Sequence, residues 1–216
     1  MTSWEARAQA YRESPLHREG PDLDRLVEWA EPASDLDALD VATGGGHVAR
    51  RLREAGCRVV SCDPTPGMQP DVICRAEDLP FADGSFDVVA TRIAPHHFDD
   101  VQAAVREMAR VSRKLVLVED TLYESEQVEE AERLHDPTHV RSYTEEEWRA
   151  MLAAADLEVE DMELFEKRQS VDAWLARTGC TGEDAERVRQ LLAHRIENAV
   201  LRDTKILLKG RKRRAS

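Results

Sequence analysis

The segment Leu36–Ala49 has the sequence LDALDVATGGGHVA: an apolar run with an acidic residue near its end, three consecutive glycines and an apolar helical pattern. This order is typical of a buried strand that turns tightly into a helix. Glycine suits such a turn because a Cβ would block positive φ angles and keep a ligand away from main-chain N–H groups. The spacing Gly44-x-Gly46-x-x-Ala49 fits a dinucleotide fingerprint, so this segment predicts a nucleotide site but not the nucleotide.

Length and composition predict a single domain over residues 1–210 of the 216. The net charge of −13 disfavours a nucleic-acid partner, because such proteins need a basic face to neutralise phosphates. No apolar run approaches the ~20 residues of a membrane span, and residues 1–12 lack the apolar core of a signal peptide, so we expect a cytoplasmic protein with no membrane partner.

The four cysteines lack CxxC spacing, which favours reduced thiols and no metal site. The oligomeric state stays open, a homodimer included.

Hydrophobic periodicity predicts alternating strands and helices, which indicates a doubly wound α/β domain. Strands are expected directly before the glycines and then at 58–63, 71–74, 85–91, 114–119, 158–166 and 204–208. Helices are expected at 4–12, 21–30, 48–55, 101–111, 124–134, 144–155, around Trp174 and at 183–198. Thr144 and Glu147 form a predicted capping box.

Asp63 ends the second predicted strand, 17 residues after Gly46 and close to the ~20 at which an acidic residue meets a ribose in such units. A carboxylate suits this contact because it accepts hydrogen bonds from two neighbouring hydroxyls. The alternative is a simple turn residue ahead of Pro64. The segment 92–98, RIAPHHF, follows the fourth predicted strand, at the sheet edge where ligands bind.

Taken together, these segments resemble class I S-adenosylmethionine (SAM) methyltransferases, particularly the small-molecule group that includes the quinone C-methyltransferases. No Tyr-x-x-x-Lys pair is present, which speaks against a short-chain dehydrogenase. The resemblance covers roughly residues 21–165, with a later block at 136–144 and Trp148. Its ordered motifs are LDVATGGGH (39–47), DPTPGM (63–68), AEDLPF (76–81), GSFDVV (84–89) and APHHF (94–98).

The resemblance implies a Rossmann-like sheet of seven mostly parallel strands with helices on both faces and a reversed last strand at 204–208. It also implies SAM as the cofactor, with Asp63 on the ribose hydroxyls, Ala76 and Glu77 beside the adenine, and the Arg92 carbonyl near the amino-acid end. The full set of expected cofactor-binding residues is Asp40, Ala42, Thr43, Gly44, Gly46, Asp63, Pro64, Ala76, Glu77 and Arg92.

Methyl transfer from a sulfonium is an in-line displacement, so a general base is needed only when the nucleophile arrives protonated. His97 and His139 are the candidate bases, and Arg141 is a candidate contact for an anionic group. The alternatives are that His97 packs under its loop and that His139 fixes a lid. We expect a helical cap at 1–34, a lid at 120–157 and a disordered basic tail at 211–216.

The sequence departs from the family pattern next to Asp63. Prolines and a glycine between positions 64 and 70 leave room for a turn where relatives carry a helix. Arg75 stands where relatives often have a carboxylate for the adenine amino group, and it either stacks on the adenine or points into solvent. Two hypotheses follow: a SAM-dependent methyltransferase acting on a small, aromatic or otherwise apolar acceptor, or a catalytically silent methyltransferase-like partner protein.

Overall fold

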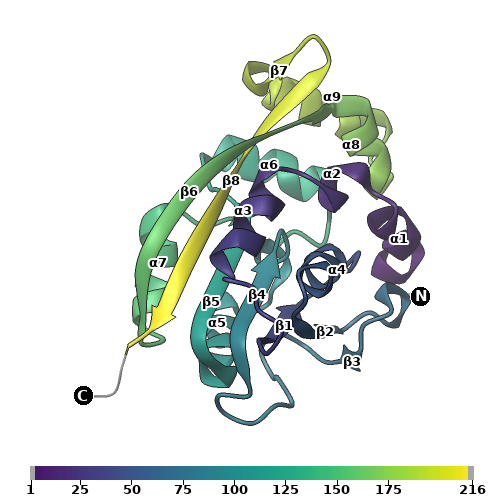
Figure 1. Ribbon diagram of the computed structural model, residues 1–216. Coiled ribbons are helices and arrows are strands. Elements are labelled where there is room, and N and C mark those ends of the chain that lie inside the picture. The colour runs from purple at the N-terminus through teal and green to yellow at the C-terminus, as the bar shows by residue number, and fades with distance from the viewer. Residues whose placement is uncertain (1–2, 214–216) are drawn as a thin grey trace.

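The computed structural model describes residues 3–213, which form one mixed sheet flanked by helices (Figure 1). Seven strands follow the order β3-β2-β1-β4-β5-β8-β6, and the short β7 pairs with β8. β1 to β5 pair in parallel, whereas β8 runs antiparallel to both β5 and β6. The Rossmann-like fold with a reversed last strand is therefore confirmed. The strands are β1 (Asp37–Val41), β2 (Arg58–Asp63), β3 (Val72–Ile73), β4 (Phe86–Arg92), β5 (Ser112–Thr121), β6 (Leu157–Ser170), β7 (Ile196–Glu197) and β8 (Val200–Lys212).

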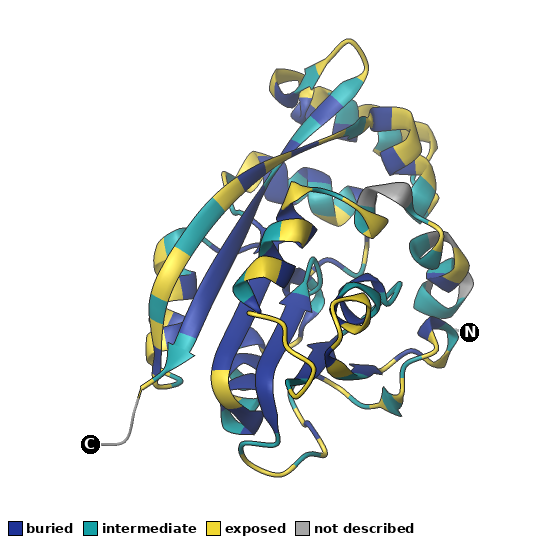
Figure 2. Ribbon diagram, viewed as in Figure 1, coloured by how far each residue is buried: buried dark blue, intermediate teal, exposed yellow. Residues whose placement is uncertain are grey.

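The helices form layers on both faces of the sheet, and the central strands between them are buried (Figure 2). α3 and α4 pack Leu26 and Leu52 on one face, whereas α5 and α7 pack Met108 and Trp148 on the other. A third apolar cluster joins α6, α8 and α9 to the start of β8. The helices are α1 (Ser3–Arg12), α2 (Pro15–Arg18), α3 (Pro21–Trp29), α4 (His47–Glu54), α5 (Val101–Val111), α6 (Glu126–His135), α7 (Glu145–Ala153), α8 (Val171–Thr178) and α9 (Gly182–Leu191).

Several helices begin at the capping residues that the sequence offers. The Asp100 side chain accepts a hydrogen bond from the N–H of Ala103 at 2.9 Å and starts α5. The predicted capping box at α7 is confirmed, because Thr144 and Glu147 each accept a hydrogen bond from the other's backbone N–H. Such caps satisfy N–H groups that have no partner inside the helix.

The segment 183–198 is not one helix, so that prediction is wrong at its C-terminal end. α9 ends at Leu191, and β7 and β8 then form a hairpin. Asn198 and Ala199 both have positive φ, +52° and +62°, in the turn of this hairpin. Two successive left-handed residues are typical of a tight hairpin turn and incompatible with a helix.

The basic tail expected from residue 211 is also wrong for Arg211 and Lys212, which end β8. β6 pairs with β8 from Leu157 opposite Lys212 to Ser170 opposite Val200. The Lys212 ammonium donates to two main-chain carbonyls at the end of α5 and the start of β5, at 3.0 Å each, which fixes the strand end. Residues 214–216 of the expected tail lie outside the described residues. No helix between residues 3 and 213 is long and apolar enough to cross a membrane.

Candidate functional site

A cavity of about 280 Å³ opens at the carboxyl ends of β1, β2 and β4, the edge at which a ligand is expected. This volume is near the lower end of the ~300–1,000 Å³ typical of small-molecule sites. Nine of the ten expected cofactor-binding residues line it; Gly46 does not and instead precedes α4 as its N-cap. The nine are Asp40, Ala42, Thr43, Gly44, Asp63, Pro64, Ala76, Glu77 and Arg92.

Asp40 holds the glycine turn from within. One of its carboxylate oxygens accepts hydrogen bonds from the Ala49 N–H at 3.0 Å and from the Thr43 hydroxyl. The residue is only 1% exposed, and this burial raises the pKa of its carboxyl to about 6. Because its bonds go to the turn and to α4, Asp40 shapes the site chiefly by fixing the backbone.

The glycine turn brings its main chain to the cavity by using left-handed conformations. Gly44 and Gly46 have φ of +50° and +73°, and Ala42, two residues before Gly44, has φ of +53°. An alanine in this region is strained, a feature that clusters at ligand sites. A Cβ on Gly45 would lie 2.7 Å from the carbonyl oxygen of Tyr11 in α1, so only glycine fits beneath that helix.

Asp63 lies directly against the glycine turn. One carboxylate oxygen accepts the Gly44 N–H at 3.0 Å, and the other accepts the Thr65 N–H at 2.9 Å. The residue is buried, and burial raises the pKa of its carboxyl. Each oxygen can accept more than one hydrogen bond, so acceptor positions remain for a ligand's hydroxyl groups.

The neighbouring wall is a loop, as expected from the prolines. A 3₁₀ turn at Pro66–Met68 replaces the longer helix, and buried Met68 lines the cavity. Arg75 lies at the rim with an exposed side chain, paired with the Asp99 carboxylate at 2.5 Å. Glu77 accepts the Asp99 N–H at 3.0 Å. Position 75 therefore supplies a cation at the rim, and the nearby carboxylates are Glu77 and Asp99.

The charged group of Arg92 is bound by other residues of the protein. It is 4% exposed and forms ion pairs with Glu119 at 2.9 Å and with Asp22, and it donates to the His17 carbonyl at 2.9 Å. These contacts fix α2 and α3 to the sheet and leave no charge of the Arg92 side chain without a partner. The next residue, Ile93, has φ of +52°, a strained conformation for a β-branched residue at the cavity wall.

His97 lines the cavity as a neutral imidazole. Its Nδ1 lies 3.0 Å from the carbonyl oxygen of Thr138, which can only accept, so Nδ1 carries the proton and Nε2 is an acceptor. Burial lowers the pKa of His97 to about 3. The ring meets Trp4 of α1 edge to face at 4.7 Å. His97 is therefore suited to accept a hydrogen bond but is a weak base.

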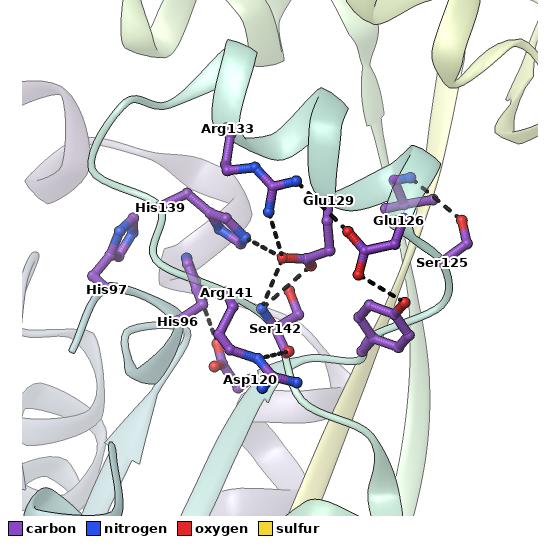
Figure 3. A network of polar contacts seen from close by, with 12 residues as sticks. His96, His97, Asp120, Ser125, Glu126, Glu129, Arg133, His139, Arg141 and Ser142 are labelled. Carbon is purple, nitrogen blue, oxygen red and sulfur yellow. Dashed lines mark hydrogen bonds and ion pairs between the residues drawn. The ribbon is translucent and has the colours of Figure 1, made fainter. Parts of the chain in front are cut away.

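His139 and Arg141 do not line this cavity. They belong to a polar network that includes Glu129 and Ser142 (Figure 3). His139 is buried, and its Nε2 lies 3.0 Å from a carboxylate oxygen of Glu129, which also accepts the Ser142 N–H at 3.2 Å. Arg141 is exposed, forms an ion pair with Glu147 at 2.8 Å and lies over the Tyr143 ring. The structure does not bring Arg141 to the site, and His139 fixes the segment after α6.

α1 and α2 lie within the helical cap expected at 1–34, but no residue of this segment was predicted as a site residue. Trp4, Tyr11 and His17 all line the cavity. α1 is bonded on both sides: Glu5 and Arg12 contact the backbone of Gly67, and Arg7 binds Asp136 at 3.0 Å and the Thr178 carbonyl at 3.0 Å. No local motif marks these residues, because the helix reaches the site only through tertiary contacts.

A second, smaller cavity of about 60 Å³, which we call the inner cavity, adjoins the first. The two share Tyr11, His17, Ile93 and His97 as lining residues. His96 and His139 line the inner cavity, and His96 donates from Nδ1 to the buried Asp120 carboxylate. Between residues 3 and 213, no three His, Cys, Asp or Glu side chains are placed to hold a metal ion.

Known proteins resemble this chain in sequence and in fold. A family profile described as a methyltransferase domain matches residues 39–117. The uncharacterized methyltransferase YcgJ of Bacillus subtilis is 32% identical over 215 residues, covering 89% of this chain and 84% of YcgJ. The YcgJ crystal structure superposes with a TM-score of 0.81 at 28% identity, covering 90% of this chain and 99% of that one. A demethylmenaquinone methyltransferase of Beutenbergia cavernae is 39% identical over 94 residues, covering 38% of this chain and 39% of the relative.

Proposed function

The chain belongs to the class I SAM-dependent methyltransferases, and we propose that it transfers a methyl group from SAM to a small-molecule acceptor by in-line displacement. One observation carries the proposal: the Asp63 carboxylate accepts a hydrogen bond from the Gly44 N–H in the larger of the two cavities, which we call the main cavity. A carboxylate beside a glycine turn suits an adenosine sugar, which presents two neighbouring hydroxyls.

The residues of the main cavity fit this cofactor. Asp63 keeps free acceptor positions for the ribose, and Ala76 and Glu77 border the space next to it. The main chain at Arg92 is available for the amino-acid end, because the side chain is bound elsewhere. When bound, SAM supplies a methyl group on a sulfonium, which is open to displacement by a nucleophile.

The chain contributes alignment and the exclusion of water, which account for much of the catalysis that such a displacement needs. α1 covers the cavity, and Trp4 holds the His97 ring from that side. Neutral His97 offers Nε2 as a hydrogen-bond acceptor that orients the incoming molecule; with a pKa of about 3 it retains little ability to take a proton. We propose that residues 1–34 act as a cap over the cofactor and residues 120–157 as the lid over the acceptor.

The alternative function is a methyltransferase-like protein without turnover, favoured by Arg75 and the short loop at 64–75. Calorimetry of the wild-type chain with SAM, S-adenosylhomocysteine and NAD tests the proposal. Saturable binding of both SAM compounds and none of NAD is expected. A folded chain that binds neither SAM compound would overturn the proposal, and binding of NAD alone would indicate an oxidoreductase.

A further inference from the structure

The inner cavity has a strongly polar lining. Its volume of about 60 Å³ compares with the ~10–15 Å³ that one water requires on this measure, so it suits a molecule of few heavy atoms. Three acidic and three basic side chains line it, drawn from α6, β6, α8 and β8 together with the residue after α6. They are Glu132, Asp136, Asp203, Lys167, Arg177 and Lys205.

Four of these six charges are neutralised by partners within the protein. The pairs are Asp136 with Arg7 at 3.0 Å, Lys167 with Asp22 at 2.7 Å, and Lys205 with Asp203. The other two, Glu132 from α6 and Arg177 from α8, form no ion pair among residues 3–213, although the Glu132 charge acts on Arg177 from a greater distance. The cavity therefore has one carboxylate and one guanidinium without an ion-pair partner. Such a lining is complementary to a molecule that carries both a positive and a negative charge.

Arg177 lacks an acidic partner. Among residues 3–213, its guanidinium donates a hydrogen bond to the side-chain oxygen of Gln169 and forms no ion pair with a carboxylate. Burial lowers the pKa of the Arg177 guanidinium, because the loss of water outweighs the opposing effect of Tyr11, Asp203 and Glu132, none of which forms an ion pair with it. A buried cation of this kind is costly unless a ligand supplies the counter-charge. A planar guanidinium binds a carboxylate through two parallel hydrogen bonds.

Glu132 has no side-chain hydrogen bond or ion pair in the described part of the chain. Burial raises the pKa of its carboxyl to about 7, so the group can take or give a proton near neutral pH. The charged or titratable groups that act on it most are Asp203, Lys205, His139 and Arg195.

We propose that the inner cavity binds a small amino acid as the methyl acceptor, with its carboxylate on Arg177 and its amine beside Glu132. This rests on the proposed function, because the shared residues Tyr11, Ile93 and His97 place the acceptor next to the cofactor cavity. It differs from the apolar acceptor expected from the sequence, since six charged side chains line the inner cavity.

The transfer step balances with these groups. The Glu132 carboxylate takes one proton from the acceptor's ammonium, which frees the nitrogen lone pair. A bond then forms from that nitrogen to the methyl carbon, and the carbon–sulfur bond breaks with its electron pair on sulfur. The products are the N-methylammonium form of the acceptor, S-adenosylhomocysteine and protonated Glu132, which returns its proton to water.

Calorimetry with glycine, β-alanine and γ-aminobutyrate in the presence of S-adenosylhomocysteine tests the proposal. At least one should bind, and propylamine and propionate, which each lack one charged group, should bind about 10- to 100-fold more weakly. Arg177→Gln should lower amino-acid affinity by a similar factor and leave affinity for S-adenosylhomocysteine unchanged. Glu132→Gln should retain binding of the amino acid but lose methyl transfer, measured as release of S-adenosylhomocysteine from SAM.

Matched controls are Glu130→Gln, on the same helix but paired with Arg187 at the surface, and Arg168→Gln, at an exposed position of β6. Both should behave as the wild type. The inner-cavity proposal is overturned if SAM binds while none of the amino acids does, or if Arg177→Gln weakens S-adenosylhomocysteine instead. A chain that binds no SAM compound contradicts the proposed function, and the amino acids are then titrated alone to judge the inner cavity separately.

Discussion

Replacing Asp63 by Asn separates cofactor binding from folding. The amide has nearly the same shape as the carboxylate, and its oxygen can still accept the Thr65 N–H. The other position becomes an NH₂ group that faces the Gly44 N–H, so that hydrogen bond is lost. The substitution also removes the negative charge and half of the acceptor positions offered to a ribose.

The expected loss of SAM affinity follows from these contacts. A hydrogen bond to a charged acceptor contributes about 1.5–3 kcal/mol, so two ribose hydroxyls account for about 3–6 kcal/mol, of which the one neutral oxygen of Asn retains about 0.5–1.5 kcal/mol. The dissociation constant for SAM should therefore rise by about 10²- to 10³-fold.

Folding stability should change much less. Burial raises the folded-state pKa of Asp63 above its unfolded value, so its favourable contribution exists at low pH and is lost as pH rises through the folded-state value. At neutral pH the wild type carries a penalised charge, which the amide removes. This gain opposes the loss of the Gly44 hydrogen bond, which costs about 1–3 kcal/mol.

Calorimetry gives the affinity for SAM, and urea unfolding monitored by circular dichroism gives the stability. Asp78→Asn, at an exposed position in the same half of the molecule and outside the cavity lining, is the matched control. A folded Asp63→Asn chain that binds SAM as tightly as the control would refute the assigned ribose contact.

Three further perturbations test other parts of the site. Gly45→Ala places a Cβ 2.7 Å from the α1 backbone, so SAM affinity and the urea midpoint should both fall, by about 1–3 kcal/mol in stability; unchanged values contradict the close packing. Arg92→Met leaves two buried carboxylates without this partner and should cost about 3–5 kcal/mol of unfolding free energy; a loss below about 1 kcal/mol would show that the network is dispensable. Hydrogen bonds from Thr138 and, to a smaller extent, the pair with Arg7 lower the Asp136 pKa to about 2, so both contacts should weaken as pH falls from about 4 to 2; α1 tryptophan fluorescence should report this, and Asp136→Asn should abolish that change.

Much of the fold follows from local patterns. β2 and α5 have the bounds that periodicity predicts, because strong apolar repeats and a capping residue define both ends. The segment after α9 could not be predicted in this way. Its helical composition is overridden by the hairpin turn at Asn198 and by long pairing of β8 with β6, which are tertiary effects.

In the candidate site too, residues of a local motif could be predicted and residues that meet through tertiary contacts could not. Asp63 and the glycine turn were predictable, because one βαβ unit brings them together. Glu132 and Arg177 come from separate helices, and the absence of a partner for each depends on every other charge nearby. Likewise His97 was expected to titrate near neutral pH, whereas burial keeps it neutral.

The attachment of α1 on both of its sides has a consequence for the rate of product release. Glu5 and Arg12 hold the helix to Gly67 on one side, and Arg7 holds it to Asp136 on the other. We expect spent cofactor to leave faster once the contacts on one side break, so that the helix would act as a gate. We expect release of S-adenosylhomocysteine, rather than the chemical step, to limit the turnover rate. Removing the α1 contacts on either side should speed this release.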